Sequence, residues 1–560
     1  MTKKWEVSEV NNDEVEEFAK KHKLSNLLAS ILIHKNITTD EGVEKFLHPT
    51  RMDFYDPFLL PDMEKAIDRI VKAVENKENI TIYGDYDVDG ITSITLLKNF
   101  FANSGVDVKT YIPDRLEEGY GLNKNAIREI SYSDTTLILT VDCGITGIEE
   151  IEYAKQIGID VIVTDHHEPG EEIPDCIAVV DAKRKDSKYP FNQLAGCGVA
   201  FKLMQALAIK WKLPEKEYLK FLDIAAIGTI SDIVPLIDEN RVIAKLGLML
   251  VERTNNIGLK TLIDLCGFKK IDSTMVSFGL SPRINACGRL GHADEALELF
   301  LANDKNTTVK LAKKMNEYNT ARQQVERKIY DEAVEEIIKE KDKPVIVLGK
   351  EGWHHGVAGI VSSKITDEYF KPSILICFEG DEGKGSGRSI PGFDLHEALM
   401  KCSEYLEKFG GHSMAVGITI KKDKFEDFKN AFTEYAESKN ISEIVPVINI
   451  ERKIDLKDVS LSNVKELQKL EPFGEQNKMP LFLIENLKIV SIRALSEGKH
   501  LKILLKQDNF FIDAIGFNMG DLTEQYKIED RVDIVGTIDV NVFNGNENVQ
   551  ITIKDMRKAI

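Results

Sequence analysis

Three aspartates stand at alternate positions in one short segment of this chain, at Asp85, Asp87 and Asp89. The apolar run before them, residues 79–83, reads as a buried strand, and the apolar residues of 91–101 recur with helical spacing. Flanking glycines allow a tight turn between strand and helix. Like charges at one strand end repel one another unless cations hold them together. The segment therefore predicts a metal site at the carboxyl end of a strand.

An EF-hand calcium loop is the alternative interpretation of these aspartates. Together with Gly90 they fit the first half of that loop's pattern, but its twelfth position needs a bidentate glutamate and holds Leu96. A strand is also predicted before the loop, where an EF-hand has a helix. The mismatch favours a different kind of metal site.

Length and composition indicate a globular protein of several domains. A chain of 560 residues is too long for one core, so about three domains are expected. Seven scattered cysteines without a C-x-x-C pair argue against a disulfide framework and a zinc ribbon. The first residues lead into no apolar signal segment, and no apolar run is long enough to span a bilayer. We therefore expect a cytoplasmic protein that does not associate with membranes.

The net charge of −19 argues against non-specific coating of duplex DNA, which needs concentrated Lys and Arg. It leaves room for a nucleic-acid enzyme with a local basic channel. An acidic exterior would restrict binding to that channel.

From residue 79 onward, predicted strands and helices alternate, which indicates a parallel sheet with helices on its faces. Strands are predicted at residues 79–83, 108–112, 136–141 and 160–164. Ligands of open α/β sheets bind outside the carboxyl ends of the strands. The three-aspartate segment, Asp142 and the pair His166 and His167 all fall there, so we expect them to lie together.

Residues 305–340 are predicted to form one helix of roughly 50 Å, which could bridge two domains or pack as an ordinary helix. Its apolar stripe has one seven-residue gap, at Arg322. The predicted order is an N-terminal helical segment packing on the catalytic domain (1–75), an α/β catalytic domain (76–304), the connecting helix (305–340), a second α/β domain (341–445) and a small β-barrel (446–560).

The residues at the predicted strand ends suit a divalent metal. The aspartate segment with Asp142, His166 and Asp232 supplies the carboxylate and imidazole ligands that Mn²⁺ or Mg²⁺ takes. So many carboxylates could hold two ions about 3.5 to 4 Å apart, which would activate a water and stabilise the leaving oxygen of an in-line displacement at phosphorus. His167 is a further ligand or a hydrogen-bond donor to the scissile phosphate, and we favour the second. Asp165 is a ligand or orients a neighbouring imidazole.

Two further segments combine positive charge with glycine. Residues 281–289 contain Arg283 and Arg289, and residues 384–389 contain Ser386 and Arg388. Backbone donors, hydroxyls and guanidinium groups suit phosphate oxygens, although glycine-rich turns are more often plain loops. Neither segment matches a Walker A loop, so no ATP hydrolysis is expected.

These motifs resemble a known superfamily. Residues 84–90, 142–144, 165–167 and 228–232 are similar to the four ordered motifs of the DHH phosphoesterases. Residues 352–360, 385–389 and 410–417 resemble the associated DHHA1 domain, and residues 281–289, 471–477 and the β-rich tail are most similar to the bacterial single-strand-specific exonucleases of that superfamily. Gln476 stands where a glycine is expected, a difference confined to one turn.

The resemblance implies an enzyme that hydrolyses single-stranded DNA from its 5′ end to 5′-mononucleotides in DNA repair and recombination, with two Mn²⁺ or Mg²⁺ ions. It implies as metal ligands Asp85, Asp87, Asp89, Asp142, His166 and Asp232, and leaves open which loop aspartates bind directly. All of these except Asp85, together with His167, would be catalytic. The implied phosphate ligands are Arg115, Arg283, Ser386, Arg388 and His412. A single-stranded-DNA-binding protein and a helicase are the implied partners of a monomeric chain.

The tail would be an OB-like fold, which binds single strands through a basic groove and stacking aromatics. The stacking candidates are Phe510, Phe511, Phe517 and Phe543, although the sequence favours barrel core as the role of any one of them. Three other functions are weighed here: a phosphodiesterase for very short RNA or cyclic dinucleotides, an inorganic pyrophosphatase and a non-enzymatic scaffold. The tail argues against the first two, and the full ligand set against the third.

Overall fold

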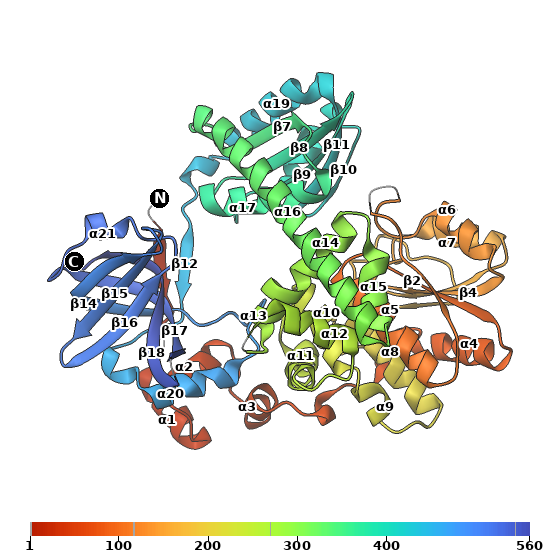
Figure 1. Cartoon of the computed structure of the whole chain (residues 1–560), viewed down its shortest axis with the longest axis horizontal. Coiled ribbons are helices and arrows are strands. Elements are labelled where there is room, and N and C mark those ends of the chain that lie inside the picture. The colour runs from red at the N-terminus through yellow and green to blue at the C-terminus, as the bar shows by residue number, and fades with distance from the viewer. Residues whose placement is uncertain (1–2, 10, 116–117, 269, 544, 560) are drawn as a thin grey trace.

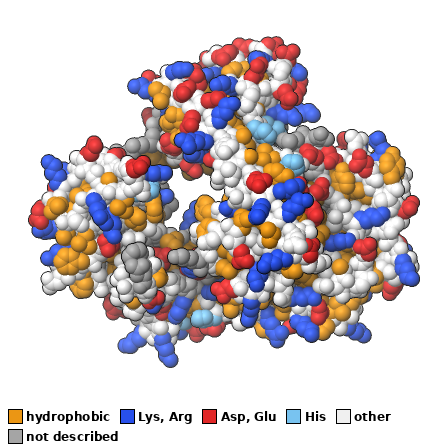
Figure 2. Space-filling view, in the orientation of Figure 1, with side chains coloured by type: hydrophobic (Ala, Val, Ile, Leu, Met, Phe, Trp, Pro, Cys, Tyr) orange, Lys and Arg blue, Asp and Glu red, His pale blue; other side chains and the backbone are white. Residues whose placement is uncertain are grey.

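Three lobes surround an opening in the computed structural model, which describes residues 3–9, 11–115, 118–268, 270–543 and 545–559 (Figure 1). The opening is also visible between the side chains in the space-filling view of Figure 2. Two lobes are α/β units and the third is a barrel, as the sequence predicts. Among the described residues, no helix is both long and apolar enough to cross a membrane.

The first α/β lobe is built on a five-stranded parallel sheet of order β3-β2-β4-β5-β6. Its strands are β2 (Asn79–Gly84), β3 (Lys109–Tyr111), β4 (Thr135–Val141), β5 (Asp160–Thr164) and β6 (Ala178–Val180). The central strands are buried on both faces, which explains their nearly continuous apolar sequence. Successive connections leave β2 in opposite directions, so a crevice opens at the carboxyl ends of β2 and β4.

Helices cover both faces of this sheet. One face packs on α4 (Met63–Glu75), α5 (Val88–Asn103), α8 (Gly196–Lys210) and α10 (Leu222–Ser231), and the other on α6 (Lys124–Ser131) and α7 (Ile148–Gln156). The remaining helices of the lobe are α9 (Lys216–Leu219), α11 (Asp238–Val251), α12 (Ile257–Cys266), α13 (Ser273–Met275), α14 (Ser281–Arg289) and α15 (Ala293–Leu301). Because α5 and α8 are buried on nearly all sides, the first lobe holds the crevice residues on rigid elements.

The predicted connecting helix is α16 (Lys305–Lys339), and it does bridge two lobes (Figure 1). Leu311 and Met315 belong to the core of the first lobe, whereas Ile329 and Ala333 belong to that of the second. The gap in its apolar stripe, at Arg322, falls between these two contacts.

The second α/β lobe has a sheet of order β10-β11-β9-β8-β7. Its elements are β7 (Ile346–Glu351), α17 (His355–Tyr369), β8 (Ser373–Glu379), β9 (Glu382–Arg388), α18 (Leu395–Lys401), β10 (Lys408–Gly411), β11 (Ala415–Lys421) and α19 (Phe425–Ser438). The glycine-rich segment 384–389 is mostly strand β9, where a loop was the simplest prediction. A Cβ at Gly383, Gly385 or Gly387 would lie 2.6 to 2.8 Å from side chains of the neighbouring strands. Strand alternation therefore puts Ser386 and Arg388 on the opposite face, toward α17.

The C-terminal lobe is a closed barrel. Its strands are β14 (Phe482–Leu495), β15 (His500–Gln507), β16 (Phe510–Gly516), β18 (Asn546–Lys558) and β17 (Arg531–Phe543), and β17 pairs back with β14. The short elements β13 (Arg452–Lys453), α20 (Leu461–Leu467) and α21 (Leu522–Gln525) accompany it. This confirms the predicted barrel.

The N-terminal segment is divided between two lobes. Strand β1 (Lys4–Val7) pairs in parallel with β12 (Val447–Ile450), which joins the second lobe to the barrel. After α1 (Asn12–His22), helices α2 (Asn26–His34) and α3 (Asp40–Leu47) share the barrel's core, whereas α4 belongs to the first lobe. The sequence prediction placed all of residues 1–75 on the catalytic domain, because an amphipathic pattern predicts a helix but not its partner.

Candidate active site

The predicted acidic residues meet at the carboxyl end of the first sheet. Asp85 follows β2, Asp142 follows β4 in the left-handed conformation with φ 59°, and His166 follows β5. Asp87 caps the N-terminus of α5, where its carboxylate accepts hydrogen bonds from the amides of Asp89 and Gly90. Strand ends and helix caps thus bring together groups that are far apart in the sequence.

Asp89 is held by the N-terminus of a second helix. Its carboxylate accepts hydrogen bonds from the amides of Gly196, at 2.6 Å, and Cys197, at 2.9 Å, in the first turn of α8. The positive end of the helix stabilises the negative charge there. Gly196 is needed at this point, because a Cβ would lie 2.6 Å from the side chain of Asp142. Sequence reasoning missed these two donors, since backbone amides leave no side-chain signal.

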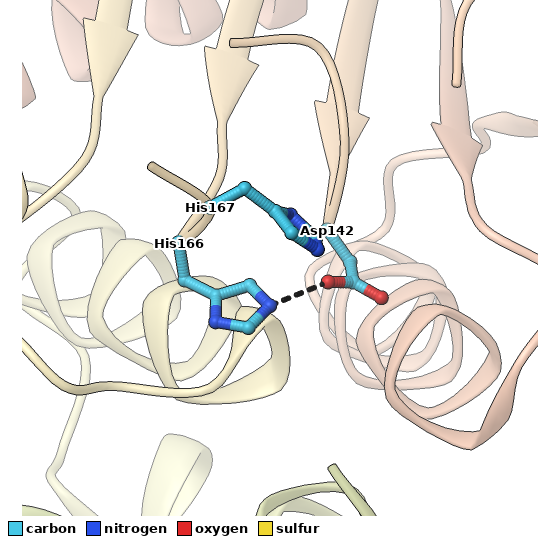
Figure 3. Close-up of side chains that lie close together, drawn as sticks. All are labelled: Asp142, His166 and His167. Atoms are coloured by element: carbon cyan, nitrogen blue, oxygen red, sulfur yellow. Dashed lines mark ion pairs between the residues drawn. The ribbon is translucent and has the colours of Figure 1, made fainter. Parts of the chain in front are cut away.

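The imidazole of His166 points toward the carboxylate of Asp142 (Figure 3). Its Nε2 lies 3.0 Å from Asp142 Oδ1, 3.6 Å from Asp232 Oδ2 and 3.8 Å from Asp89 Oδ2. Burial lowers the pKa of His166 to about 4, although the charges of Asp89 and Asp165 act to raise it. The ring is therefore neutral near pH 7, which is the form that binds a metal.

Four buried polar atoms at this point have no hydrogen-bond partner: Asp85 Oδ1, Asp142 Oδ1, His166 Nε2 and Asp232 Oδ2. Burial raises the pKa of all three of these carboxyl groups, and the charges of neighbouring aspartates raise them further. Unpaired buried acceptors are costly and rare. A divalent cation would satisfy them, and oxygen-rich ligands with one imidazole suit Mn²⁺ or Mg²⁺.

The ligand atoms converge in three overlapping groups, each with its atoms within 4.8 Å of one another. The groups are Asp85 with Asp87 and Asp142, Asp89 with His166 and Asp232, and Asp142 with His166 and His167. The three groups together contain every residue predicted as a metal ligand. The residues present therefore fit a resident metal.

His167 differs from His166 in its surroundings. Its Nδ1 lies 2.7 Å from Asp165 Oδ1, and the hydroxyl of Tyr120 lies 3.1 Å from the same nitrogen. Burial acts to lower the pKa of His167, but the bond with Asp165 outweighs it and the pKa is raised. Asp165 also accepts hydrogen bonds from the amides of Ile145, His166 and His167. Asp165 thus orients an imidazole, and Tyr120 is a neighbour that sequence reasoning missed.

A cluster of arginines lies where the first and second lobes meet. The guanidinium of Arg115 lies 4.9 Å from the ring centre of Tyr86, the residue after Asp85. Arg289 of α14 donates to the carbonyl of Gly356 in the second lobe, at 2.8 Å. Burial, helped by the charges of Arg115, Arg322 and Arg388, lowers the pKa of Arg289 to about 10. These four arginines, the arginine cluster, attract an anion strongly.

The predicted phosphate ligands fall in different places. Ser386 and Arg388 lie beside α17, where a Cβ at Gly359 would be 3.4 Å from both. His412 is exposed in the turn between β10 and β11. Arg283 donates to the carbonyl of Gly279, at 2.7 Å, and to Asn316 of α16, at 3.0 Å. Arg115 and Arg388 thus lie in the cluster with Arg289, whereas the guanidinium of Arg283 is engaged in hydrogen bonds within the protein and His412 lies at the surface.

Two members of the arginine cluster, Arg322 and Arg289, were not predicted as site residues. Arg322, whose side chain is bonded to Asn319 and Glu326, stands at the gap in the apolar stripe of α16, and this gap is the sequence signal that could have found it. Arg289 stood in a segment already singled out. His355, whose pKa is lowered by burial and by the charges of Lys384 and Arg115, is a further residue at this junction of the lobes.

A groove of about 1160 Å³ begins beside Asp232 and runs along α14 and α16. It ends at residues 473–479, the segment that leads into the barrel. Its lining comes from segments far apart in the sequence, among them Ile233, Phe278, Arg289, Arg322, Phe473 and Lys478. Ile233 and Phe278 are 71% and 75% exposed, so the groove has an apolar stretch next to the carboxylates. Such a groove could receive a flexible polymer that carries flat apolar groups.

Three of the stacking candidates on the barrel are surface residues. Phe510, Phe511 and Phe517 are about half exposed, and Lys506 lies over the ring of Phe511 at 5.1 Å. Barrel core is therefore the wrong explanation for these three. The side chain of Phe543 lies outside the described residues.

Comparison with known families identifies the parts of this arrangement. The model of the DHH family, N-terminal domain, matches residues 79–229, the DHHA1 domain model matches 342–438, and the RecJ OB domain model matches 450–555. The fold and the site thus define a DHH phosphoesterase that carries a DHHA1 domain and an OB barrel.

The relatives are more specific. The single-stranded-DNA-specific exonuclease RecJ of Bacillus subtilis is 40% identical over 559 residues, which cover 99% of this chain and 70% of the relative. The crystal structure of RecJ from Thermus thermophilus with Mn²⁺ superposes with a TM-score of 0.86 at 30% identity, covering all of this chain and 80% of that one. A second structure of that protein, with Mg²⁺, has a TM-score of 0.80 at 28% identity and covers 100% of this chain and 79% of that one. The chain belongs to the RecJ family.

Proposed function

We propose that this protein is a 5′-to-3′ exonuclease that hydrolyses single-stranded DNA to 5′-mononucleotides and acts in DNA repair and recombination. The observation that carries the proposal is the position of the unpaired ligand atoms of Asp85, Asp142, His166 and Asp232 next to the arginine cluster. Metal ligands suit the attack at phosphorus, and the cations suit the phosphates that flank the scissile bond. Family membership supports the exonuclease reaction.

The proposed ligand set is the one predicted from the sequence, with Asp87 and Asp89 contributing from the start of α5. When bound, two divalent ions would lower the pKa of a water and stabilise the leaving oxygen. His167, oriented by Asp165 and holding a raised pKa, would donate from Nε2 to the scissile phosphate. A ring nitrogen of His167 can also reach a metal shared with Asp142 and His166, so ligation is the competing role.

A pocket for the end of the strand, the end-binding pocket, would be formed by Arg115, Ser386 and Arg388. Arg289, which the sequence analysis did not choose, would belong to it as well. Its cations would hold the phosphate at the strand's end and so fix the number of nucleotides removed per cleavage. His412, on an exposed turn, would meet the strand outside this pocket. Arg283 would join only by giving up its bonds to Gly279 and Asn316. Assignment of the pocket to the 5′ end follows the superfamily resemblance.

Selectivity for single strands would come from the groove beside Asp232 and from the barrel. A groove that leads past Phe278 to buried carboxylates suits one strand with splayed bases, and a stiff duplex would be excluded. The exposed rings of Phe510, Phe511 and Phe517 would stack further bases. Partners in the cell would include a single-stranded-DNA-binding protein and a helicase, and the chain would act as a cytoplasmic monomer.

The test is digestion of one single-stranded oligonucleotide, labelled at either end, with Mn²⁺ or Mg²⁺ and a chelator control. The proposal predicts immediate release of mononucleotide from the 5′-labelled strand and a slowly shortening ladder from the 3′-labelled strand. The reverse pattern would overturn the polarity. Cleavage of dinucleotides alone would favour a short-substrate phosphodiesterase, and rapid digestion of a blunt duplex would contradict the strand selectivity.

A further inference from the structure

Arg241 of α11 is buried, and it donates to the backbone of two separate segments. Its Nε donates to the carbonyl of Phe46, at 2.8 Å, and Nη1 to that of Leu470, at 2.9 Å. Nη2 donates to the carbonyls of Lys469 and Glu471, at 3.2 and 3.0 Å. One side chain of the first lobe thus binds three consecutive carbonyls on the barrel side of the ring.

Lys245 lies one turn further along α11 and repeats the pattern. Its Nζ donates to the carbonyls of Leu47, at 2.8 Å, and Lys469, at 3.0 Å. The carbonyls of Phe46 and Leu47 end α3, and those of 469–471 end a short 3-10 turn, so both cations meet helix C-termini, where positive charge is favourable. Burial nevertheless lowers the pKa of Arg241 to about 9 and of Lys245 to about 8.

The segment held in this way, residues 469–479, is called the clasp loop below. It leads into the barrel and supplies Phe473 and Lys478 to the wall of the groove. The carbonyl of Glu475 accepts a hydrogen bond from the amide of Leu236 at 2.9 Å, and a Cβ at Gly474 would lie 2.6 Å from the Leu236 side chain. The clasp loop therefore contacts the first lobe at three places: on α11, four residues after Asp232, and at Lys270, whose Nζ lies 2.7 Å from Glu471 Oε1.

The loop that follows Asp232 is itself under strain. Ile233 has φ 60°, a conformation that a β-branched residue rarely adopts, and Asp238 has φ 44°. Such a backbone persists only where its surroundings hold it. Asn240 holds the carbonyl of Pro235 from one side, and Glu475 of the clasp loop holds Leu236 from the other.

We propose that Arg241 and Lys245 fasten the clasp loop so that the three lobes form a closed ring around the substrate, and that this closure keeps one strand engaged through successive cleavages. The inference rests on the proposed function. A strand inside a closed ring cannot leave sideways, so its new end returns to the site as an intramolecular partner. Arg241 and Lys245 are positioning residues, since they touch neither the carboxylates nor the groove.

The experiment measures the nucleotides removed per encounter from a long 3′-labelled single strand, with excess unlabelled DNA added as a trap. Arg241→Met should shorten each run by about tenfold or more, because three hydrogen bonds to the clasp loop from a charged donor are lost. Lys245→Met, which frees one carbonyl of that loop, should shorten it less. Hydrolysis of a trinucleotide by either variant should stay within about twofold of wild type, because a trinucleotide needs no ring.

Arg69→Met is the matched control. Arg69 is also a partly buried arginine of the first lobe, but it pairs with Glu78 and Asp160, at the end of the sheet away from the carboxylates. This variant should lose stability without losing run length. If Arg69→Met shortens the runs as much as Arg241→Met does, a general loss of stability of the first lobe explains the effect. The proposed role of Arg241 and Lys245 is then overturned.

A second readout does not depend on activity. Amide hydrogen exchange should accelerate in residues 469–479 and at Leu236 in Arg241→Met, and should not change in β4. Unchanged exchange there would overturn the inference even if the proposed function holds. If wild-type protein releases no nucleotides from single strands, the proposed function fails, whereas accelerated exchange in the variant would still show that Arg241 closes the ring.

Discussion

The carboxylates and the arginine cluster are two groups of like charge that meet at Tyr86, the first largely buried and the second mostly half-buried. The carboxylates come from strand ends and helix caps of the first lobe alone. The arginines come from the first lobe, α16 and β9 of the second lobe, so they exist only when the lobes are docked. The arrangement of the carboxylates therefore depends on the first lobe alone, whereas the arrangement of the arginine cluster depends on docking of the two lobes.

The largest effect should follow from Asp142→Asn, because this side chain contributes to two of the three ligand groups. The turnover number should fall by more than about a hundredfold, which is the most that loss of an outer partner usually costs a metal site. Metal-dependent hydrolysis of a labelled single strand measures it. Activity within threefold of wild type would remove Asp142 from the ligands.

Asp165→Asn should cost about ten- to a hundredfold in kcat with little change in KM, because it disturbs the orientation of His167 but leaves the arginine cluster in place. Steady-state kinetics on a short single strand separates the two constants. An equal rise in KM would show instead that Asp165 supports substrate binding.

Arg388→Ala should behave in the opposite way, raising KM by about ten- to a hundredfold through the loss of about 1.5 to 3 kcal/mol of charged hydrogen bonding. The salt dependence of single-strand binding should also weaken, by about 0.7 in its logarithmic slope for each phosphate that the variant no longer neutralises. The same measurements on Arg289→Ala and Arg283→Ala sharpen the contrast. Arg289→Ala should resemble Arg388→Ala, whereas Arg283→Ala should mainly lower stability, and the opposite outcome would restore Arg283 to the pocket.

In the metal-free protein, the carboxylates should make the free energy of unfolding depend on pH. The pKa values of Asp85, Asp142 and Asp232 are raised in the folded state, so the native form binds more protons than the unfolded form. Its free energy of unfolding should therefore fall as pH rises from the ordinary carboxyl pKa of about 4 through the raised values, by about 1.4 kcal/mol for each pH unit that separates the folded and unfolded pKa of a group. Urea unfolding across this range measures the slope. Asp142→Asn should flatten it, and an unchanged slope would contradict the assigned repulsion.

The smallest effect is expected from Phe511→Ala on the barrel. Loss of one stacking surface costs about 1 to 3 kcal/mol for a base that uses it, so binding of long single strands should weaken while trinucleotide hydrolysis is unchanged. Electrophoretic titration with strands of increasing length gives this comparison. Equal losses on short and long substrates would place Phe511 outside strand binding.

Much of the carboxylate site could be predicted from the sequence, because parallel strands deliver their carboxyl ends to one edge. Asp85, Asp142, His166 and Asp232 each stand at the end of a recognisable apolar segment. The amides of Gly196 and Cys197 could not be found in this way, since the α8 N-terminus contributes backbone groups only.

The arginine cluster was only partly predictable. Arg283 and Arg289 lie in one motif, but six residues on a helix turn them roughly 120° apart, so at most one faces the second lobe. The sequence analysis chose Arg283 as a phosphate ligand. In the structure it is Arg289 that points toward the second lobe, whereas Arg283 is bonded to Asn316. Likewise β9 reads as a glycine-rich loop, because glycine is depleted from strands, and only the crowding by neighbouring side chains shows why it is needed there.

The most direct test that the carboxylates and the arginine cluster are separate regions is the number of Mn²⁺ ions bound per chain. Electron paramagnetic resonance of the free ion gives this number for wild type, Asp142→Asn and Arg388→Ala. We expect about two ions in wild type and in Arg388→Ala, and a clear loss in Asp142→Asn, whose affinity for single strands should persist in the absence of metal. Full metal binding by Asp142→Asn, or loss of metal by Arg388→Ala, would contradict the division between a metal centre and an end-binding pocket.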